Sequence, residues 1–182
     1  KENIKSIQPT GEISHLKTEP LKSEGELYLG IDAGSTSCDI AVLSSELKLI
    51  YSDYRRTMGK PLETINEALE TVFKKFNKNK ITFAAATGSA SRLIASLLEI
   101  PYINEVSAQA AAIAYLYPHF PQATVIEMGG QDSKLLFLKT ENGRPALSDF
   151  ALNSACAAGT GSFLDQQAQR LGVNIENEFG KM

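Results

Sequence analysis

The sequence contains no tryptophan, and only two cysteines and two histidines among its 182 residues. Cys38 and Cys156 lie far apart, so they do not form the dense pattern of a secreted disulfide scaffold. His15 and His119 are isolated as well, and such scattered side chains lack the ligand spacing of a zinc site. A nucleophilic cysteine also needs a neighbouring base, and the sequence places no histidine near either cysteine. These three classes of site are therefore excluded, and each cysteine needs its own explanation.

Long runs of one charge and long apolar runs are also absent. The 18 basic and 21 acidic side chains give a formal net charge of -3, with no block of lysine and arginine. That balance excludes the electrostatic pattern of a protein that binds the nucleic-acid backbone. No apolar run approaches the roughly 18 to 20 residues that cross a bilayer, and the first residues lack a signal-peptide pattern. We expect a soluble, cytoplasmic protein whose partners are neither nucleic acids nor membranes.

Residues 1–26 differ from the rest of the chain in composition. They cannot bury enough apolar surface to offset their conformational entropy, so we predict a flexible tail or linker. From Leu27 onwards, apolar patterns and turn residues predict regular elements. The expected strands cover 27–31, 38–43, 48–56, 81–86, 124–128, 133–139 and 145–153, and the expected helices start at Pro61, cover 90–98 and 105–117, and follow Gly159.

The helix that starts at Pro61 shows the clearest apolar period. Its core-facing side chains are expected to be Leu62, Ile65, Leu69, Val72, Phe73 and Phe76. That spacing predicts an amphipathic helix packed on the strands. Cys38 lies in the middle of an expected strand, where a cysteine behaves as a small hydrophobic residue.

Two segments of the sequence share one design. Residues 31–35 read IDAGS and residues 126–130 read IEMGG, each an apolar strand end, an acid, one residue, a glycine and a small residue. Each is followed by a predicted β-meander, so the chain contains one βββ-α unit and the front of a second. The alternative is coincidence, because many β-hairpins end in glycine and aspartate.

Such acidic glycine turns suit phosphate chemistry. A glycine turn presents backbone N–H groups with no Cβ in the way, and this geometry cradles phosphate oxygens. Two facing turns would clamp the β- and γ-phosphates of a nucleotide and support phosphoryl transfer. The candidate residues are Asp32, Gly34, Ser35 and Thr36 in the first turn, and Glu127, Gly129, Gly130, Gln131 and Asp132 in the second.

The acids of these turns are the candidate Mg²⁺ ligands, because Mg²⁺ takes hard oxygen ligands, often through water. We assign Asp32, Glu127 and Asp132 to the metal, and expect Gln131 to orient the attacking water, so that Asp32, Gln131 and Asp132 form the catalytic set. The sequence has no Walker motif, and no GxGxxG leads from a strand into a helix, so neither a P-loop nor a Rossmann site is supported.

Three motifs resemble a known family. LGIDAGST at 29–36 resembles the first phosphate motif of the superfamily that includes actin, hexokinase, acetate kinase and the large heat-shock chaperones. MGGQDSK at 128–134 and NSACAAGTGSFLD at 153–165 resemble the ATP-dependent activators of 2-hydroxyacyl-CoA dehydratases and the ATPase subunits of benzoyl-CoA reductase. The resemblance implies an α/β, actin-like (ribonuclease H-like) ATPase fold: a βββ-αβα lobe and the start of a second, duplicated lobe.

The resemblance also implies an ATPase that donates electrons. Family members are homodimers that share a [4Fe-4S] cluster and pass an electron to a dehydratase or reductase partner at the expense of ATP. Cys156 matches the first cluster ligand of each subunit, and it precedes a glycine-rich turn and an expected helix whose N-terminus favours a thiolate. The cofactors implied are ATP or ADP, Mg²⁺ and the cluster.

The resemblance places the second cluster cysteine and the adenosine-binding glycine motif beyond Met182. We therefore expect a fragment, with a first lobe over 27–120 and the truncated start of a second lobe over 121–182. Two other functions stay open: a small-molecule kinase of the same superfamily, and a nucleotide-binding module of a longer fused protein without turnover of its own.

Overall fold

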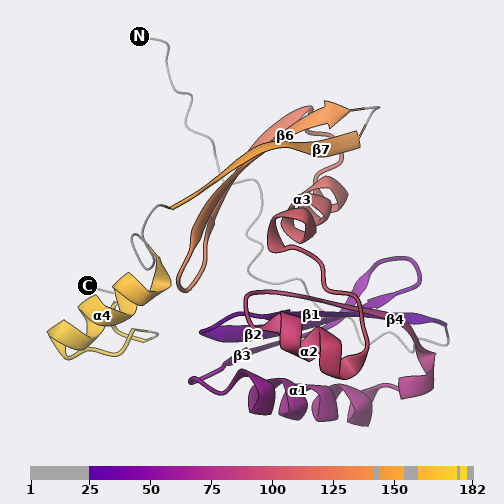
Figure 1. Cartoon of the computed structure of the whole chain (residues 1–182), viewed down its shortest axis with the longest axis horizontal. Helices are drawn as coiled ribbons and strands as arrows, with labels where there is room; N and C mark the ends of the chain where they lie inside the picture. The colour runs from indigo at the N-terminus through magenta and orange to yellow at the C-terminus, as the bar shows by residue number, and fades with distance from the viewer. Residues whose placement is uncertain (1–24, 142–143, 154–159, 176, 180–182) are drawn as a thin grey trace.

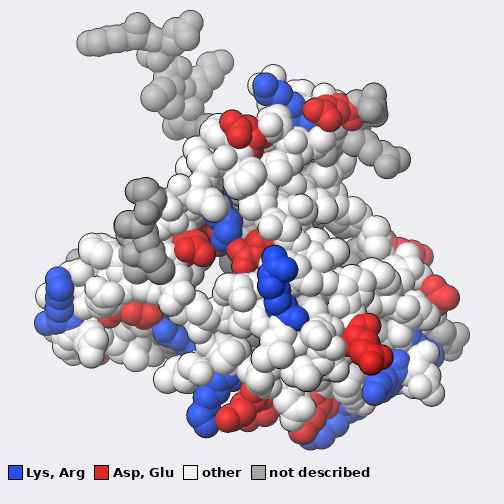
Figure 2. Space-filling view, viewed as in Figure 1, with Lys and Arg blue, Asp and Glu red and all other residues white. Residues whose placement is uncertain are grey.

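The computed structural model describes residues 25–141, 144–153, 160–175 and 177–179. Two β-sheets dominate these residues: the first lies low in Figure 1 and the second above it, with helix α3 between them. Acidic and basic side chains are interspersed over the face seen in Figure 2, as the nearly balanced composition predicts.

The first sheet has four strands in the order β3-β2-β1-β4. Strands β1, β2 and β3 form an antiparallel meander, and β4 lies parallel to β1. Their bounds are β1 Leu27–Ala33, β2 Ser37–Ser44, β3 Leu49–Arg56 and β4 Ile81–Thr87. A parallel neighbour needs a crossover, which helix α1 (Pro61–Lys75) and the short 3-10 helix η2 (Lys78–Lys80) supply. The four predicted strands and the helix that starts at Pro61 are confirmed.

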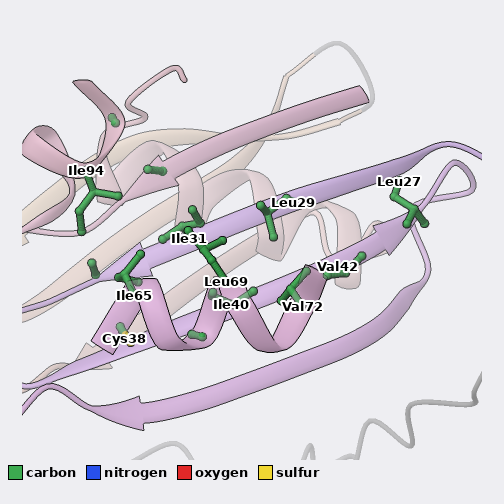
Figure 3. Close-up of a cluster of buried hydrophobic side chains, with 14 of the residues drawn as sticks. Leu27, Leu29, Ile31, Cys38, Ile40, Val42, Ile65, Leu69, Val72 and Ile94 are labelled. Atoms are coloured by element: carbon green, nitrogen blue, oxygen red, sulfur yellow. The ribbon is translucent and has the colours of Figure 1, made fainter. Parts of the chain in front are cut away.

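Helix α1 buries one face against this sheet, as Figure 3 shows for Ile65, Leu69 and Val72. These side chains pack with β1 and β2 side chains such as Ile31 and Ile40. Cys38 is 1% exposed within the same core, which confirms its role as a small hydrophobic residue. The prediction was wrong for two side chains of the apolar stripe: Leu62 and Phe73 are 44% and 38% exposed, because they lie to the sides of the buried face.

Helix α2 (Ser91–Leu98) follows β4, and its Ile94 packs into the core of the first sheet. Helix α3 (Glu105–Leu116) belongs to a different core. Its Val106 and Ala110 pack against Leu136 and Leu138 of the second sheet. Both helices confirm the expected elements, and α3 connects the two sheets in space as well as in sequence.

The second sheet is an antiparallel meander in the order β5-β6-β7. Its strands are β5 Gln122–Met128, β6 Ser133–Glu141 and β7 Arg144–Leu152. The β5–β6 register repeats the β1–β2 register: Asp32 is paired with Asp39, and Glu127 with Lys134. The internal repeat predicted from the sequence is therefore confirmed at the level of individual residue pairs.

Helix α4 (Gly161–Leu171) follows the second sheet and confirms the last predicted helix. Within the described part of the chain, we find no helix with the length and apolar character that crossing a membrane requires.

Candidate functional site

A cavity of about 190 Å³ lies where the first turns of the two sheets meet. Figure 2 shows acidic side chains beside a basic one next to the hollow near the centre of the visible face. The residues that line the cavity are Asp32, Gly34, Ser35, Thr36, Ser37, Asp39, Ser89, Glu105, Gln109, Glu127, Gly129, Gly130, Gln131, Asp132 and Lys134. The structure thus brings together all nine residues that the sequence assigned to the two turns.

The two turns have the same hydrogen-bond geometry. The N–H of Gly34 donates to the carbonyl of Ser37 at 2.9 Å, and the N–H of Gly129 donates to the carbonyl of Asp132 at 2.9 Å. Each bond closes the tight turn between the first two strands of its sheet. Two equivalent turns therefore approach one cavity from opposite sheets.

The turns also touch each other. A Cβ placed on Gly130 would overlap the Thr36 hydroxyl, so only glycine allows this approach. Helix α4 is attached to the same turn, since the N–H groups of Gly161 and Ser162 donate to the carbonyls of Gly129 and Gly130 at 2.9 and 2.8 Å. The second turn is therefore held between Thr36 and the first turn of α4.

Asp32 is held at the end of β1 by the corner that follows β4. The N–H of Ala33 donates to the Ser91 hydroxyl at 3.1 Å, and the N–H of Ala90 donates to the Ala33 carbonyl at 2.8 Å. Gly88 has a φ of +101°, and a Cβ there would overlap the Asp32 carboxylate. Both the backbone conformation and the close approach require glycine.

Lys134 lies at the side of the cavity between two acids. Its Nζ is 2.9 Å from Glu105 on α3 and 3.0 Å from Glu127 at the end of β5. Its side chain is only 9% exposed, which is rare for lysine unless it is paired. Desolvation acts to lower the pKa of Lys134, but the hydrogen bonds to Glu105 and Glu127 outweigh it and raise that pKa. Lys134 is therefore a fixed cation.

Two carboxyls on the first sheet, Asp32 on β1 and Asp39 on β2, have raised pKa values. The surrounding protein desolvates Asp39, and the charges of Asp32 and Asp53 repel its own, so its pKa rises from 3.8 to about 6. Desolvation also raises the pKa of Asp32, as does repulsion from Glu105. An acidic cavity of this kind has a strong electrostatic preference for bound cations.

Mg²⁺ fits the donor set only in part. Asp32, Asp39 and Asp132 offer hard oxygens to the cavity, whereas the Glu127 carboxylate is paired with Lys134. Among the residues that the structure describes, no three His, Cys, Asp or Glu side chains are arranged to hold a metal ion. A Mg²⁺ ion there would complete its coordination with phosphate and water oxygens, as this ion usually does beside nucleotides.

Some site residues were not predicted from the sequence. Lys134 is the last residue of the MGGQDSK motif at 128–134, but the sequence pattern assigns it no role, and it predicts Glu105 only as the first residue of a helix. A signal for Lys134 existed: in β6 it lies two residues before Leu136 and four before Leu138, both buried, so it points to the same face as they do. Cys156 lies outside the described residues, so its predicted role stays a prediction.

The chain is similar in sequence and in fold to proteins that are already known. An (R)-2-hydroxyglutaryl-CoA dehydratase activating ATPase from Acidaminococcus fermentans is 33% identical over 82% of this chain and 55% of its own. The crystal structure of component A of that organism's dehydratase has a TM-score of 0.66 and 32% identity, covering 83% of this chain and 56% of that one. The activator of the 2-hydroxyisocaproyl-CoA dehydratase from Clostridium difficile, with bound ADPNP, has a TM-score of 0.65 and 29% identity, covering 82% and 53%.

These neighbours have the actin-like ATPase fold, so the predicted fold class is confirmed. The chain spans about half the length of the curated relatives it matches. The model of the BadF/BadG/BcrA/BcrD ATPase family matches residues 29–180, which are most of the sequence. The chain therefore belongs to the BadF/BadG/BcrA/BcrD ATPase family.

Proposed function

We propose that this chain is the nucleotide-binding part of an ATP-dependent activator that passes an electron to a CoA-ester dehydratase or reductase. The observation that carries the proposal is the pair of duplicated acidic turns, Asp32–Ser37 and Glu127–Asp132, that face one cavity. Relatives named as activators of 2-hydroxyglutaryl-CoA and lactoyl-CoA dehydratases supply the partner class.

In this proposal the nucleotide phosphates lie between the two turns. The N–H groups of Gly34 and Gly129 already close the turns, so the donors to phosphate are the next amides, at Ser35, Thr36, Gly130 and Gln131. Successive amides in such turns form a concave anion site. Gln131 orients the attacking water, and no covalent intermediate with the protein is needed.

Asp32 and Asp132 hold Mg²⁺ through water in the same proposal. When bound, the ion neutralises the phosphate charge that develops during transfer. Glu127 takes a smaller part than the sequence predicts, because its carboxylate is engaged by Lys134 at 3.0 Å. Glu127 instead helps to fix the lysine.

The proposed electron carrier is a [4Fe-4S] cluster held at a homodimer interface, with Cys156 as one ligand. When bound, such a cluster stores and transfers one electron at a time. Cys156 precedes α4 in sequence, and α4 is bonded to the second turn through Gly161 and Ser162. A change at Gly129 and Gly130 on nucleotide binding would therefore reach Gly161 and Ser162 through these hydrogen bonds. From there it would reach Cys156 along a few residues of the chain.

The division into a first lobe over 27–120 and the start of a second over 121–182 is part of the proposal. Helix α3 falls within the first range but packs on the second sheet through Val106 and Ala110. Helix α3 therefore packs with the second lobe, although it lies within the range of the first.

Calorimetric titration with Mg²⁺ and ADPNP tests the nucleotide site. We expect the wild-type chain to bind, and Asp32→Asn to bind at least about 10-fold more weakly, since it removes a charged ligand of the bound ion. Asp149→Asn makes the same chemical change on an exposed strand position outside the cavity and should bind like the wild type. Equal affinities for all three proteins would contradict the proposed site.

Anoxic reconstitution with iron and sulfide tests the cluster. Iron retained per chain should fall in Cys156→Ser and stay unchanged in Cys38→Ala, because Cys38 is buried in the core of the first sheet. Retention that does not depend on Cys156 would contradict its role as a ligand.

A further inference from the structure

Among the described residues that line the cavity, Lys134 is the one basic side chain, whereas five are carboxylates. A nucleoside triphosphate that enters this cavity meets an excess of negatively charged side chains. Charge complementarity at the phosphates must then come from bound cations and from Lys134. The position of this lysine therefore has a large effect on the affinity of the site for phosphate.

The internal repeat shows that this cation is present in only one half of the site. In the second sheet, Lys134 on β6 is paired with Glu127 on β5. In the first sheet, Asp39 on β2 is paired with Asp32 on β1 at the equivalent position. The first half thus has two acids where the second has an acid and a base. Asp39 and Lys134 therefore hold equivalent positions in the two sheets but carry opposite charges. Of the two, only Lys134 can attract an anion.

Lys134 also keeps capacity for a ligand. An ammonium group has three N–H donors, and the ammonium group of Lys134 is paired with two carboxylates, those of Glu105 and Glu127. Glu127 lies on the neighbouring strand of the same sheet, so it moves with Lys134. Glu105 lies on α3, outside that sheet, and its side chain is 25% exposed.

The position of Glu105 reduces the cost of releasing the lysine. It lies in the first turn of α3, where the helix dipole stabilises a carboxylate without a partner. Asn104 caps the same helix by accepting from the N–H of Val106 at 2.9 Å, so the helix start does not depend on Glu105. Water reaches Glu105 once its partner leaves, because its side chain is not fully buried.

We propose that Lys134 binds a phosphate group of the nucleotide and that Glu105 is the positioning residue that holds the lysine and competes with that phosphate. This inference rests on the proposed function, since it concerns the same cavity. Removal of the Glu105 charge should tighten phosphate binding, whereas a purely structural ion pair would leave binding unchanged or weaken it.

The test is calorimetric titration of the full chain with tripolyphosphate in the presence of Mg²⁺, a probe that needs no adenosine contacts. Lys134→Met should weaken binding about 10- to 100-fold, the loss expected for a charge-assisted contact. Lys48→Met, on an exposed ion pair with Glu46 outside the cavity, should leave affinity unchanged. Glu105→Gln should tighten binding several-fold, and this gain should disappear in the double variant with Lys134→Met.

Each outcome decides between the alternatives. A Lys134→Met protein that binds like the wild type would overturn the inference, as would a Glu105→Gln protein that binds equally or more weakly. A gain from Glu105→Gln that persists in the double variant would show a general charge effect and overturn the positioning role. If Lys134→Met does not fold, Glu105→Gln alone decides. If the wild type binds neither tripolyphosphate nor ADPNP, the proposed function itself fails.

Discussion

Asp39 carries a charge that folding disfavours. Its pKa is raised from 3.8 to about 6 by desolvation and by the charges of Asp32 and Asp53. A raised folded-state pKa means that the folded protein binds the proton more tightly than the unfolded chain does. Stability from this group is therefore lost as the pH rises from about 4 through about 6.

We predict that Asp39→Asn stabilises the metal-free protein at pH 7.5. Because water reaches part of this side chain and screens it, we expect a rise in Tm of about 2 to 4 °C. The difference from the wild type should shrink as the pH falls from about 6 towards 4, because the folded protein takes up a proton on Asp39 over that range. Thermal unfolding at several pH values measures this, and a difference that grows at low pH would contradict the assigned cause.

Gly88 combines a left-handed backbone with close contact to the end of β1. We predict that Gly88→Ala costs about 2 to 4 kcal/mol, because a Cβ would overlap both the Asp32 carboxylate and the Ala33 carbonyl. Gly59→Ala is the matched control: its φ is +80°, but nothing lies within 4 Å of the added Cβ. Its cost should be about 1 to 2 kcal/mol. Urea unfolding measures the loss of stability in both variants. Equal losses would contradict a contribution from the contact of the Gly88 Cβ with Asp32 and Ala33.

The sequence was sufficient to predict the residues of the two turns, because each turn is a local pattern of acid and glycine. The structure places Asp32 and Glu127, with their turns, on one cavity. Glu105 and Gly88 were not predicted as site residues. Their roles depend on where α3 and the corner after β4 come to lie, and no local pattern encodes such long-range approach.

At the scale of elements, α1 shows how a periodic pattern determines packing. We predict that Ile65→Ala, at a side chain that is 3% exposed, destabilises the protein by about 2 to 4 kcal/mol. Leu62→Ala removes a similar volume from a side chain that is 44% exposed and should cost less than about 1 kcal/mol. Urea unfolding measures the loss of stability in both variants, and equal losses would contradict the assigned buried face of α1.

Strands and helices were predicted well, and most differ from expectation by a few residues at their ends. Alternation in β6 and the helical period of α1 are strong local signals. Helix α3 shows the limit: its alanine-rich sequence predicts a helix but gives no clear apolar face. Its packing on Leu136 and Leu138 follows from tertiary contacts alone.

At the scale of the whole molecule, α4 links the second turn to the segment that contains Cys156. We predict that Mg²⁺ and ADPNP slow hydrogen exchange at the amides of Gly161 and Ser162, which donate to the carbonyls of this turn. Ser162→Ala removes the side-chain bond to Gly130 and should reduce this protection. Ser148→Ala, whose hydroxyl donates to Phe137 away from the site, is the control. Protection that is unchanged in Ser162→Ala would contradict the linkage.

In the proposed function, two duplicated turns from different sheets hold one nucleotide between them. The most direct measurement is a nuclear magnetic resonance titration of the isotope-labelled chain with ADPNP and Mg²⁺, following the amides of Ser35, Thr36, Gly130 and Gln131. We predict that the amide signals of both turns shift together and give one common Kd. A response confined to one turn, or two turns that titrate with different Kd values, would contradict the claim.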